Sequence, residues 1–492
     1  MKRSIYSIVS FLSIFTFGII SISCGAKREY KPSSIEVAKQ YRYTDSLQSK
    51  DSLATDTTIT LAQIPWEEFF GDSILIQLID KAIVNNLDMQ QAITNIEIAN
   101  QMLLRSKAAN LPEVNATLGK FVREYHSKNY YGNPSSNYYG DKTPPNNMYT
   151  NKMQHMSDVQ VSWELDIWGK FRNKKEADLA SYLKTQEAKK AVQTELVAEI
   201  AKGYYQLLEL DAQLEVARAN AKLNDSILRI IELQYDAGEV TSLAREQTEA
   251  QKLVAQGLVP QLERQVAIQE NRLRFLIGNS PGEIERQNLD SYILETDTLV
   301  DIGNPMELLQ YRPDVYAAEL ELRRANAEVG VAQSYRYPSL NIDLTGGLDA
   351  MLGKNWFQIP GSIFGSIAAG ITQPIFNKRR LKTNFEVAKL ERDNAEINFQ
   401  KKILIGISEV SDALISMQKI DEQMTYINRR VKVTRKTVDN AFMLFKSGLA
   451  NYLEVLTAQS NAMESELDKV NLELQRRNER VNLYRSLGGG WQ

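Results

Sequence analysis

The chain contains few of the residues on which catalytic and metal sites usually depend. Its 492 residues include one cysteine and two histidines, His126 and His155. A single cysteine cannot form an internal disulfide. The sequence has no nucleophile elbow, phosphate-binding loop or zinc-ligand spacing. We therefore predict a protein that is not an enzyme and that binds neither a metal nor a cofactor.

Glycine, proline and long apolar runs are also scarce. There are 25 glycines and 13 prolines, whereas Ala, Leu, Glu, Gln and Lys dominate long regions. This composition favours long helices. Beyond residue 24 no stretch approaches the ~20 apolar residues that a transmembrane helix needs. The formal net charge is −3, which gives no general attraction to nucleic acid, so nucleic acid is not an expected partner.

The N-terminus has the features of a bacterial export signal. Met1-Lys2-Arg3 is a short basic head, and a mostly apolar run over 5–22 follows it. The run ends in small residues before Cys24, in an arrangement similar to a lipobox. We predict that 1–23 is a lipoprotein signal peptide and that Cys24 carries lipid. Because Ser21 occupies a position where leucine is usual, an ordinary signal peptide with an incidental cysteine is the alternative.

A polar stretch follows the cysteine. Residues 33–60 are rich in Ser, Thr and Asp and offer little to bury. We predict that 24–64 is a tether between the lipid and the folded body. An N-terminus with two or three acyl chains would anchor stably, because each buried methylene contributes ~0.8 kcal/mol. Membrane lipid is therefore an expected partner.

The rest of the chain repeats itself. The matching pairs include Asp88 with Asp314, Pro112 with Pro338, Gly238 with Gly448 and Gly278 with Gly488. The first two pairs are 226 positions apart (314 − 88), and the last two are 210 apart (448 − 238). The first copy therefore holds an insertion of 16 residues (226 − 210) between Pro112 and Trp168. We predict two copies of one unit, a first copy at 65–290 and a second copy at 291–492.

Apolar residues recur every seven positions in both copies. They run from Ile403 to Phe445 in the second copy and from Ile200 to Tyr235 in the first. A strict period of seven predicts a helix that packs along a narrow seam. A helix from about Arg379 to Phe445 would be ~100 Å long at ~1.5 Å per residue. Helices in globular proteins average ~11–12 residues, so a compact core is a poor alternative.

Between the helices of each copy the apolar period changes from seven to two. The alternation predicts strands at about 112–128 and 153–167 in the first copy, and at about 338–350 and 362–375 in the second. The connection 130–145 is rich in Tyr, Asn, Gly and Pro and should be an exposed loop. Strands of about ten residues with one apolar face are typical of membrane β-barrels. A soluble, half-buried hairpin would give the same alternation.

The number of strands limits the possible architectures. Four strands cannot close a barrel around a water channel. If these strands lie in a membrane, several chains must combine. The predicted fold class is therefore mainly α with a transmembrane β-barrel portion, formed by a homo-oligomer of an internally duplicated chain.

A series of short motifs, in order along nearly the whole chain after Cys24, resembles one family. The motifs are Pro65–Phe70, Asn86–Asp88, Leu111-Pro112, Trp163–Lys170, Arg312–Val315, Gln373–Phe376, Tyr452–Leu456 and Leu487–Trp491. The stretch Trp163–Lys170, where a predicted strand meets a predicted helix, is the most recognisable of them. Together they resemble the TolC-like outer-membrane factors, and in particular the NodT-type efflux lipoproteins.

The resemblance implies an architecture and a role. It implies a homotrimer with a twelve-stranded barrel in the outer membrane, four strands from each protomer, and an α-helical tunnel through the periplasm. The implied partners are a periplasmic adaptor protein and an inner-membrane pump of the resistance-nodulation-division (RND) type. The chain would be the outer-membrane channel of a tripartite efflux pump, conducting small molecules such as drugs or other toxic compounds passively outward.

The resemblance also implies where a gate would lie. In the family the periplasmic tip, just after the repeat glycines, is closed by inward-bending helices and rings of carboxylates. Glu454 matches one ring position, whereas Thr457 and Ala244 stand where further acidic residues are common. Leu453 would add an apolar constriction that gates by dewetting. The implied gate is therefore Leu453, Glu454 and Thr457; the alternative is a core leucine beside a surface glutamate.

The same region is implied as the contact with the adaptor. The segments involved are 235–243 in the first copy and 445–452 in the second. The implied contact residues are Tyr235, Gly238, Leu243, Phe445, Gly448 and Tyr452.

Two other functions fit parts of the pattern. A periplasmic adaptor lipoprotein would also be lipid-anchored and rich in coiled coil. Adaptors usually have a single helical hairpin, however, whereas this sequence predicts two. A type I protein-secretion outlet would use the same scaffold to pass whole proteins. The lipobox and the terminal 488–491 stretch favour small-molecule efflux over secretion.

Overall fold

The computed structural model describes residues 41–42, 61–127, 149–287 and 305–492. Cys24, the predicted signal peptide and the predicted loop 130–145 lie outside these ranges. The described residues form two compact units. One contains 99–127, 149–181 and 322–394, and the other contains 41–42, 61–98, 182–287, 305–321 and 395–492.

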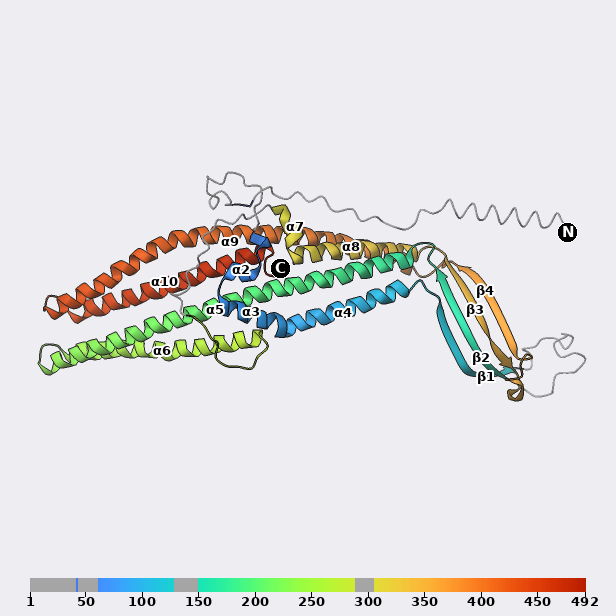
Figure 1. Ribbon diagram of the computed structural model, residues 1–492, viewed down its shortest axis with the longest axis horizontal. Helices are drawn as coiled ribbons and strands as arrows, with labels where there is room; N and C mark the ends of the chain where they lie inside the picture. Colours follow the sequence, from blue (N-terminus) through green and yellow to red (C-terminus); the bar gives the residue numbers. More distant parts are fainter. Residues whose placement is uncertain (1–40, 43–60, 128–148, 288–304) are drawn as a thin grey trace, which may run out of the picture. The chain divides into compact units, whose positions relative to one another are not determined.

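Helices account for most of the described chain (Figure 1). They are α2 (Trp66–Phe70), α3 (Ser73–Asn85), α4 (Leu87–Ala108), α5 (Lys170–Asp236), α6 (Ser242–Leu276), α7 (Leu308–Tyr311), α8 (Pro313–Ser334), α9 (Arg380–Lys446) and α10 (Tyr452–Leu487). Short 3₁₀ turns lie at Leu61–Gln63, Pro305–Glu307 and Gly353–Asn355. None of the described helices combines the length and apolar character needed to cross a bilayer.

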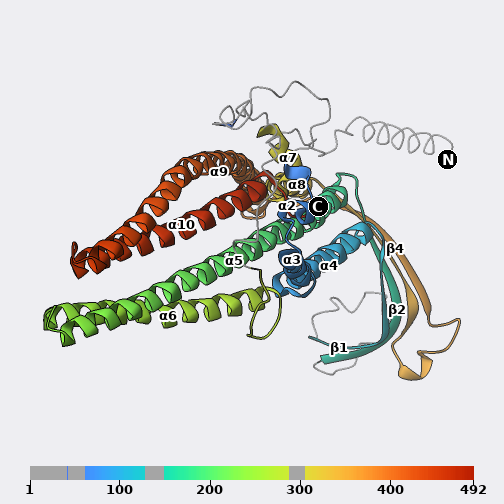
Figure 2. The same ribbon diagram turned by 60° about the vertical axis from the view of Figure 1, so that its left-hand side comes forward.

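The strands form one antiparallel sheet in chain order, and Figure 2 shows its curvature. They are β1 (Glu113–Ser127), β2 (Tyr149–Leu165), β3 (Ser339–Ala350) and β4 (Ile363–Thr372). The register gives the two faces different chemistry, because paired residues point to the same side. One row across the sheet is Val114, Val161, Leu344 and Ile367, and the adjacent row is Glu113, Ser162, Asp343 and Ala368. The expected fold class, mainly α with four strands that have one apolar face, is confirmed.

The ends of two strands differ from the sequence expectation. β2 ends at Leu165 instead of 167, because Ile167 donates its N–H back to the Leu165 carbonyl at 2.9 Å and the chain turns. β4 ends at Thr372 instead of 375. Pro374, two residues later, has no N–H to contribute to the ladder.

The seven-residue pattern lies on long helical hairpins, α5 with α6 and α9 with α10, drawn side by side in Figures 1 and 2. The seam residues Ile200, Leu207, Ile403 and Val410 are almost completely buried. Arg218 of α5 pairs with Glu263 of α6 at 2.7 Å. These contacts confirm the expectation of long helices packed along a seam.

The folded body begins before the predicted end of the tether at residue 64. Leu61 and Ala62 are buried in the main helical core, and so is Tyr41. Tyr484 of α10 stacks on Phe69 of α2 with ring centroids 4.1 Å apart. The part of the N-terminal segment that is described therefore packs against the C-terminal helix.

The second helix of the long hairpin, α6 in the first copy and α10 in the second, ends in the same way in both copies. Gly278 follows α6 with φ +70°, and Gly488 follows α10 with φ +98°. The N–H of each donates to a carbonyl of the last turn at 3.0 Å, which is a glycine C-cap. A Cβ on Gly278 would lie 2.6 Å from the Asn85 carbonyl oxygen, and one on Gly488 would lie 2.3 Å from that of Tyr311. Both sites require glycine for conformation and for space.

This crowding gives a first prediction. Gly488→Ala should lower the free energy of unfolding by about 2–4 kcal/mol, since it adds a backbone clash to the left-handed strain. Gly448→Ala is the matched control, because its φ is +70° and nothing lies within 4 Å of an added Cβ. It should cost about 1 kcal/mol. Equal losses, measured by circular dichroism during urea unfolding in detergent, would show that the contact with Tyr311 does not matter.

Candidate functional site

The tips of the two helical hairpins have the same construction. After α5, Gly238 has φ +76° and donates to the Tyr235 carbonyl at 2.9 Å; after α9, Gly448 has φ +70° and donates to the Phe445 carbonyl at 3.0 Å. Thr241 and Asn451 then cap α6 and α10. The duplication seen in the sequence therefore extends to the individual turn hydrogen bonds.

An apolar cluster joins the two tips. We call it the tip cluster; its buried members are Ile227, Ile231, Ala244, Phe445 and Val455. The first three come from α5 and α6, and the last two come from α9 and α10. The hairpins of the two copies are thus packed against each other at their ends.

The predicted gate residues lie at the start of α10. The side chain of Asn451 accepts hydrogen bonds from the backbone N–H groups of Leu453 and Glu454, at 2.9 and 3.2 Å. This cap fixes the first turn of the helix. Leu453, Glu454 and Thr457 all have exposed side chains, while Val455 between them is buried. The three residues therefore share one exposed face, and Leu453 is not a core leucine in the single chain.

The structure gives a reason for the missing carboxylate in the first copy. Ala244 is buried in the tip cluster with Phe445 and Val455. A carboxylate at this position would lose its hydration without gaining a partner of opposite charge. The two tips are therefore held together here by apolar contact.

The six residues expected to contact the adaptor differ in exposure. Tyr235, Gly238, Leu243 and Gly448 are exposed, Tyr452 is half-buried and Phe445 is buried. In the described chain the ring of Phe445 packs inside the tip cluster and supports the exposed residues around it.

One contact at the tips was not predicted from the sequence. The hydroxyl of Tyr452 on α10 donates to Oε1 of Gln247 on α6 at 2.6 Å. It adds a polar link between the copies beside the tip cluster. Gln247 is an ordinary surface glutamine in the sequence, and no motif or period indicates it.

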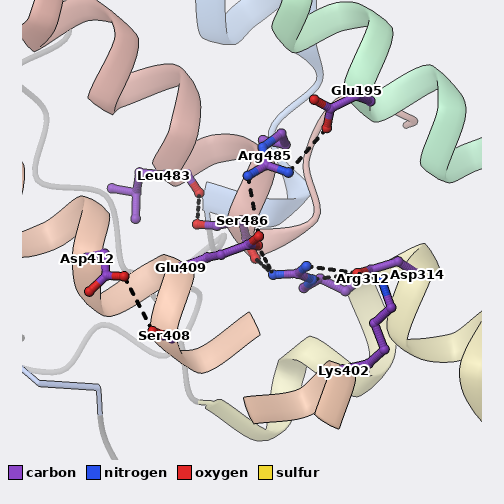
Figure 3. Close-up of polar contacts among 10 residues, drawn as sticks. All are labelled: Glu195, Arg312, Asp314, Lys402, Ser408, Glu409, Asp412, Leu483, Arg485 and Ser486. Carbon is purple, nitrogen blue, oxygen red and sulfur yellow. Dashed lines mark hydrogen bonds and ion pairs between the residues drawn. The ribbon is translucent and has the colours of Figure 1, made fainter. Parts of the chain in front are cut away.

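A cluster of charged side chains lies where α8 begins and α10 ends, and Figure 3 shows Arg312 at its centre. Arg312 is buried and donates to both oxygens of Asp314 at 2.9 Å, to Glu409 at 2.7 Å and to the Ser486 carbonyl at 3.2 Å. Arg485 extends this network, with nitrogens 3.6 Å from Glu409 and 3.2 Å from Glu195 of α5. We call this group the Arg312 network.

The charges in the network support one another. Burial opposes the positive charge of Arg312, but hydrogen bonds and attraction from Asp314 and Glu409 outweigh it and raise the pKa of the guanidinium. Burial would likewise raise the pKa of Asp314, but Arg312 and Lys402 outweigh it and lower that pKa. Both groups are therefore held in their charged forms.

At the equivalent place in the first copy a neutral side chain replaces Arg312. Asn86 stands where the second copy has Arg312 (312 − 86 = 226), and its side-chain amide donates to the Leu276 carbonyl at 2.9 Å. Leu276 and Ser486 are 210 positions apart, so the two side chains satisfy equivalent carbonyls at the ends of α6 and α10. A neutral amide serves the first copy, and an ion-pair network serves the second.

The described residues contain no group of three or more His, Cys, Asp or Glu side chains that could hold a metal ion.

Comparison with known proteins identifies the family. The outer membrane efflux protein family matches residues 78–279 and 304–489, one stretch in each copy. The chain belongs to this family. It is 28% identical to the cation efflux system protein CusC of Escherichia coli O6:H1 over 87% of this chain and 88% of that protein. It is 28% identical to the probable outer membrane lipoprotein SilC of Salmonella typhimurium over 98% of both.

Comparison with solved structures gives the same family of folds. The structure of the outer-membrane channel OprN matches with a TM-score of 0.82 at 22% identity, over 94% of this chain and 99% of that one. With the family match and the relatives above, the protein is a TolC-like outer-membrane channel component of an efflux system, located in the outer membrane. The alternative of a periplasmic adaptor is set aside by this result.

Proposed function

We propose that three copies of the chain form one continuous duct for the passive efflux of small molecules. The observation that carries this proposal is the sheet: β1 and β4 each pair on one side only in the described chain. Three copies in a ring would pair each β1 with a neighbouring β4, giving the twelve-stranded barrel that the family resemblance implies. Closure removes every strand edge, which a sheet in lipid requires.

The helices support the same assembly. On α9 the side chains of Leu390, Ile397 and Leu404 are seven positions apart and all exposed. An exposed apolar stripe with a seven-residue period is typical of a coiled-coil seam that lacks its neighbour. A second copy of the chain is the occupant that the sheet edges also require.

The remaining roles in this proposal follow the family. Cys24 carries the lipid anchor, in keeping with the lipoprotein name of SilC. Leu453, Glu454 and Thr457 form the periplasmic gate, and the exposed residues of both tips meet an adaptor that links the duct to an RND-type pump. The duct catalyses no reaction, and the pump supplies the energy.

The assembly is tested by the native mass of protein extracted in mild detergent with its lipid retained. We expect three times the mass of the processed chain, which is 55.9 kDa before signal removal. Ion conductance in planar bilayers should accompany the trimer. A monomer or dimer without conductance would leave the sheet edges open and would contradict the proposal.

A further inference from the structure

The junction between β4 and α9 exposes a group of cations that no carboxylate of the described residues neutralises. We call it the basic junction; its members are Lys378, Arg379, Arg380 and Lys382, and all four side chains are exposed. None of them has an ion pair or hydrogen bond to a carboxylate among the described residues. The nearby acids Glu386 and Asp393 pair with Lys389 and Arg392 instead.

The equivalent junction in the first copy is neutralised. Lys170 and Arg172 stand 210 positions before Arg380 and Lys382. Lys170 pairs with Glu164 at 2.5 Å, and Arg172 contacts Asp166 at 3.4 Å. The unpaired charge is therefore a property of the second junction alone, and not of the way in which every strand enters its helix.

The backbone at the basic junction has an uncommon conformation. Lys378 and Arg379 have φ of +53° and +64°, in the left-handed region that favours glycine. The first copy has Gly169 at the position of Arg379, with φ +77°. A residue other than glycine in this conformation raises the conformational energy of the backbone. Such local strain is often found at functional positions.

Two large apolar side chains immediately precede the basic junction. Ile375 is 96% exposed and Phe376 is 87% exposed, immediately before the cations. The side chain of Gln373 donates to the Arg336 carbonyl at 3.2 Å, which holds this segment beside the residues that precede β3. Cations beside exposed apolar residues are typical of a membrane–water interface, where their long side chains reach the headgroups.

We propose that the basic junction is a binding site for an anionic phospholipid surface. The cations would lie at the phosphate groups while Ile375 and Phe376 enter the acyl layer beside them. Each cation near an anionic surface adds to the attraction, and the four act together on one turn of chain. The proposal rests on the proposed function in one respect, that the end of the sheet lies at the membrane boundary.

The test uses the full-length protein in mild detergent and counts bound lipids by native mass spectrometry. The probes are phosphatidylglycerol, which is anionic, and phosphatidylcholine with the same acyl chains. Wild type should retain phosphatidylglycerol in preference to phosphatidylcholine. The variant K378Q/R379Q/R380Q/K382Q should lose about tenfold or more of this retention, because four attractive charges are removed.

A matched control removes the same charges elsewhere. Arg264, Arg429, Lys432 and Lys436 are exposed helical residues without ion pairs among the described residues. R264Q/R429Q/K432Q/K436Q should retain phosphatidylglycerol as wild type does. Equal retention by wild type and the junction variant, or equal loss in the control, would overturn the proposal. So would full displacement of the lipid by an equal concentration of inorganic phosphate.

Two further measurements keep the test decisive. If the fourfold variant does not assemble, I375S/F376S leaves every charge in place and should reduce retention about threefold through the lost apolar contact; no reduction would count against the site. Conductance of the wild type reports on the duct separately. A chain without conductance that still prefers phosphatidylglycerol would contradict the proposed function and support the lipid site.

Discussion

Arg312→Met is expected to lower the free energy of unfolding by about 3 kcal/mol. The substitution keeps the length and apolar stem of the side chain but strands Asp314 and Glu409 without their hydrogen-bonded partner. Removing one member of a buried ion pair costs about 3–5 kcal/mol, and the lower end applies because both carboxylates are partly exposed. In a chain of this size the thermal midpoint should fall by about 3 °C.

Arg218→Met is the matched control for that experiment. Arg218 pairs with Glu263 at 2.7 Å, but both side chains are about half exposed. An exposed pair contributes about 0–1 kcal/mol, so this variant should change the midpoint by less than about 1 °C. The triple variant R312M/D314N/E409Q should recover part of the loss, since it removes the stranded charges. A loss in R312M no larger than in R218M would refute a structural role for the Arg312 network.

The pH dependence of the network has a defined sign. The pKa of Asp314 is lowered from its ordinary 3.8. A lowered folded-state pKa gives stability that is present above 3.8 and is lost as the pH falls through the lower value in the folded protein. Arg312 stays charged throughout. The difference in stability between wild type and R312M should therefore be constant at neutral pH and should shrink below pH 3.8.

Periodicity made the architecture predictable from the sequence. A seven-residue period requires a buried seam, and the heptad positions from Ile200 to Leu214 and from Ile403 to Val410 are buried. The strands followed from a two-residue period, because alternate residues of a strand face opposite sides. The family motifs then indicated how the predicted helices and strands follow one another in the TolC-like fold.

Contacts between distant residues could not be read in the same way. The hydrogen bond from Tyr452 to Gln247 and the ion pair from Arg312 to Glu409 join positions 205 and 97 apart. Neither has a local signature, since glutamine and glutamate are ordinary on helix surfaces. The buried ring of Phe445 is similar, because its partners Ile227 and Ile231 come from the other copy. Such contacts depend on how the two hairpins meet.

The gate assignment gives the second large effect. The double variant L453A/E454A should raise single-channel conductance in planar bilayers several-fold and weaken the preference for cations. Leu453 and Glu454 form an exposed face on the first turn of α10. On the axis of a trimer this turn would bring three leucines and three carboxylates together, giving an apolar constriction next to a ring of negative charge. Alanine removes both and preserves the helix.

Because the chain is duplicated, Leu243 of the first copy provides a matched control for Leu453. It is the equivalent residue of the first copy (453 − 243 = 210), and its exposure of 57% is close to the 54% of Leu453. L243A removes the same side chain from the other tip, where we expect contact with the adaptor and not the constriction. It should leave conductance unchanged and weaken the pull-down of the purified adaptor. Equal conductance changes in L243A and L453A/E454A would mean that both tips line the pore. Unchanged conductance in L453A/E454A would place the constriction elsewhere, because two side chains that narrow a pore cannot be removed without widening it.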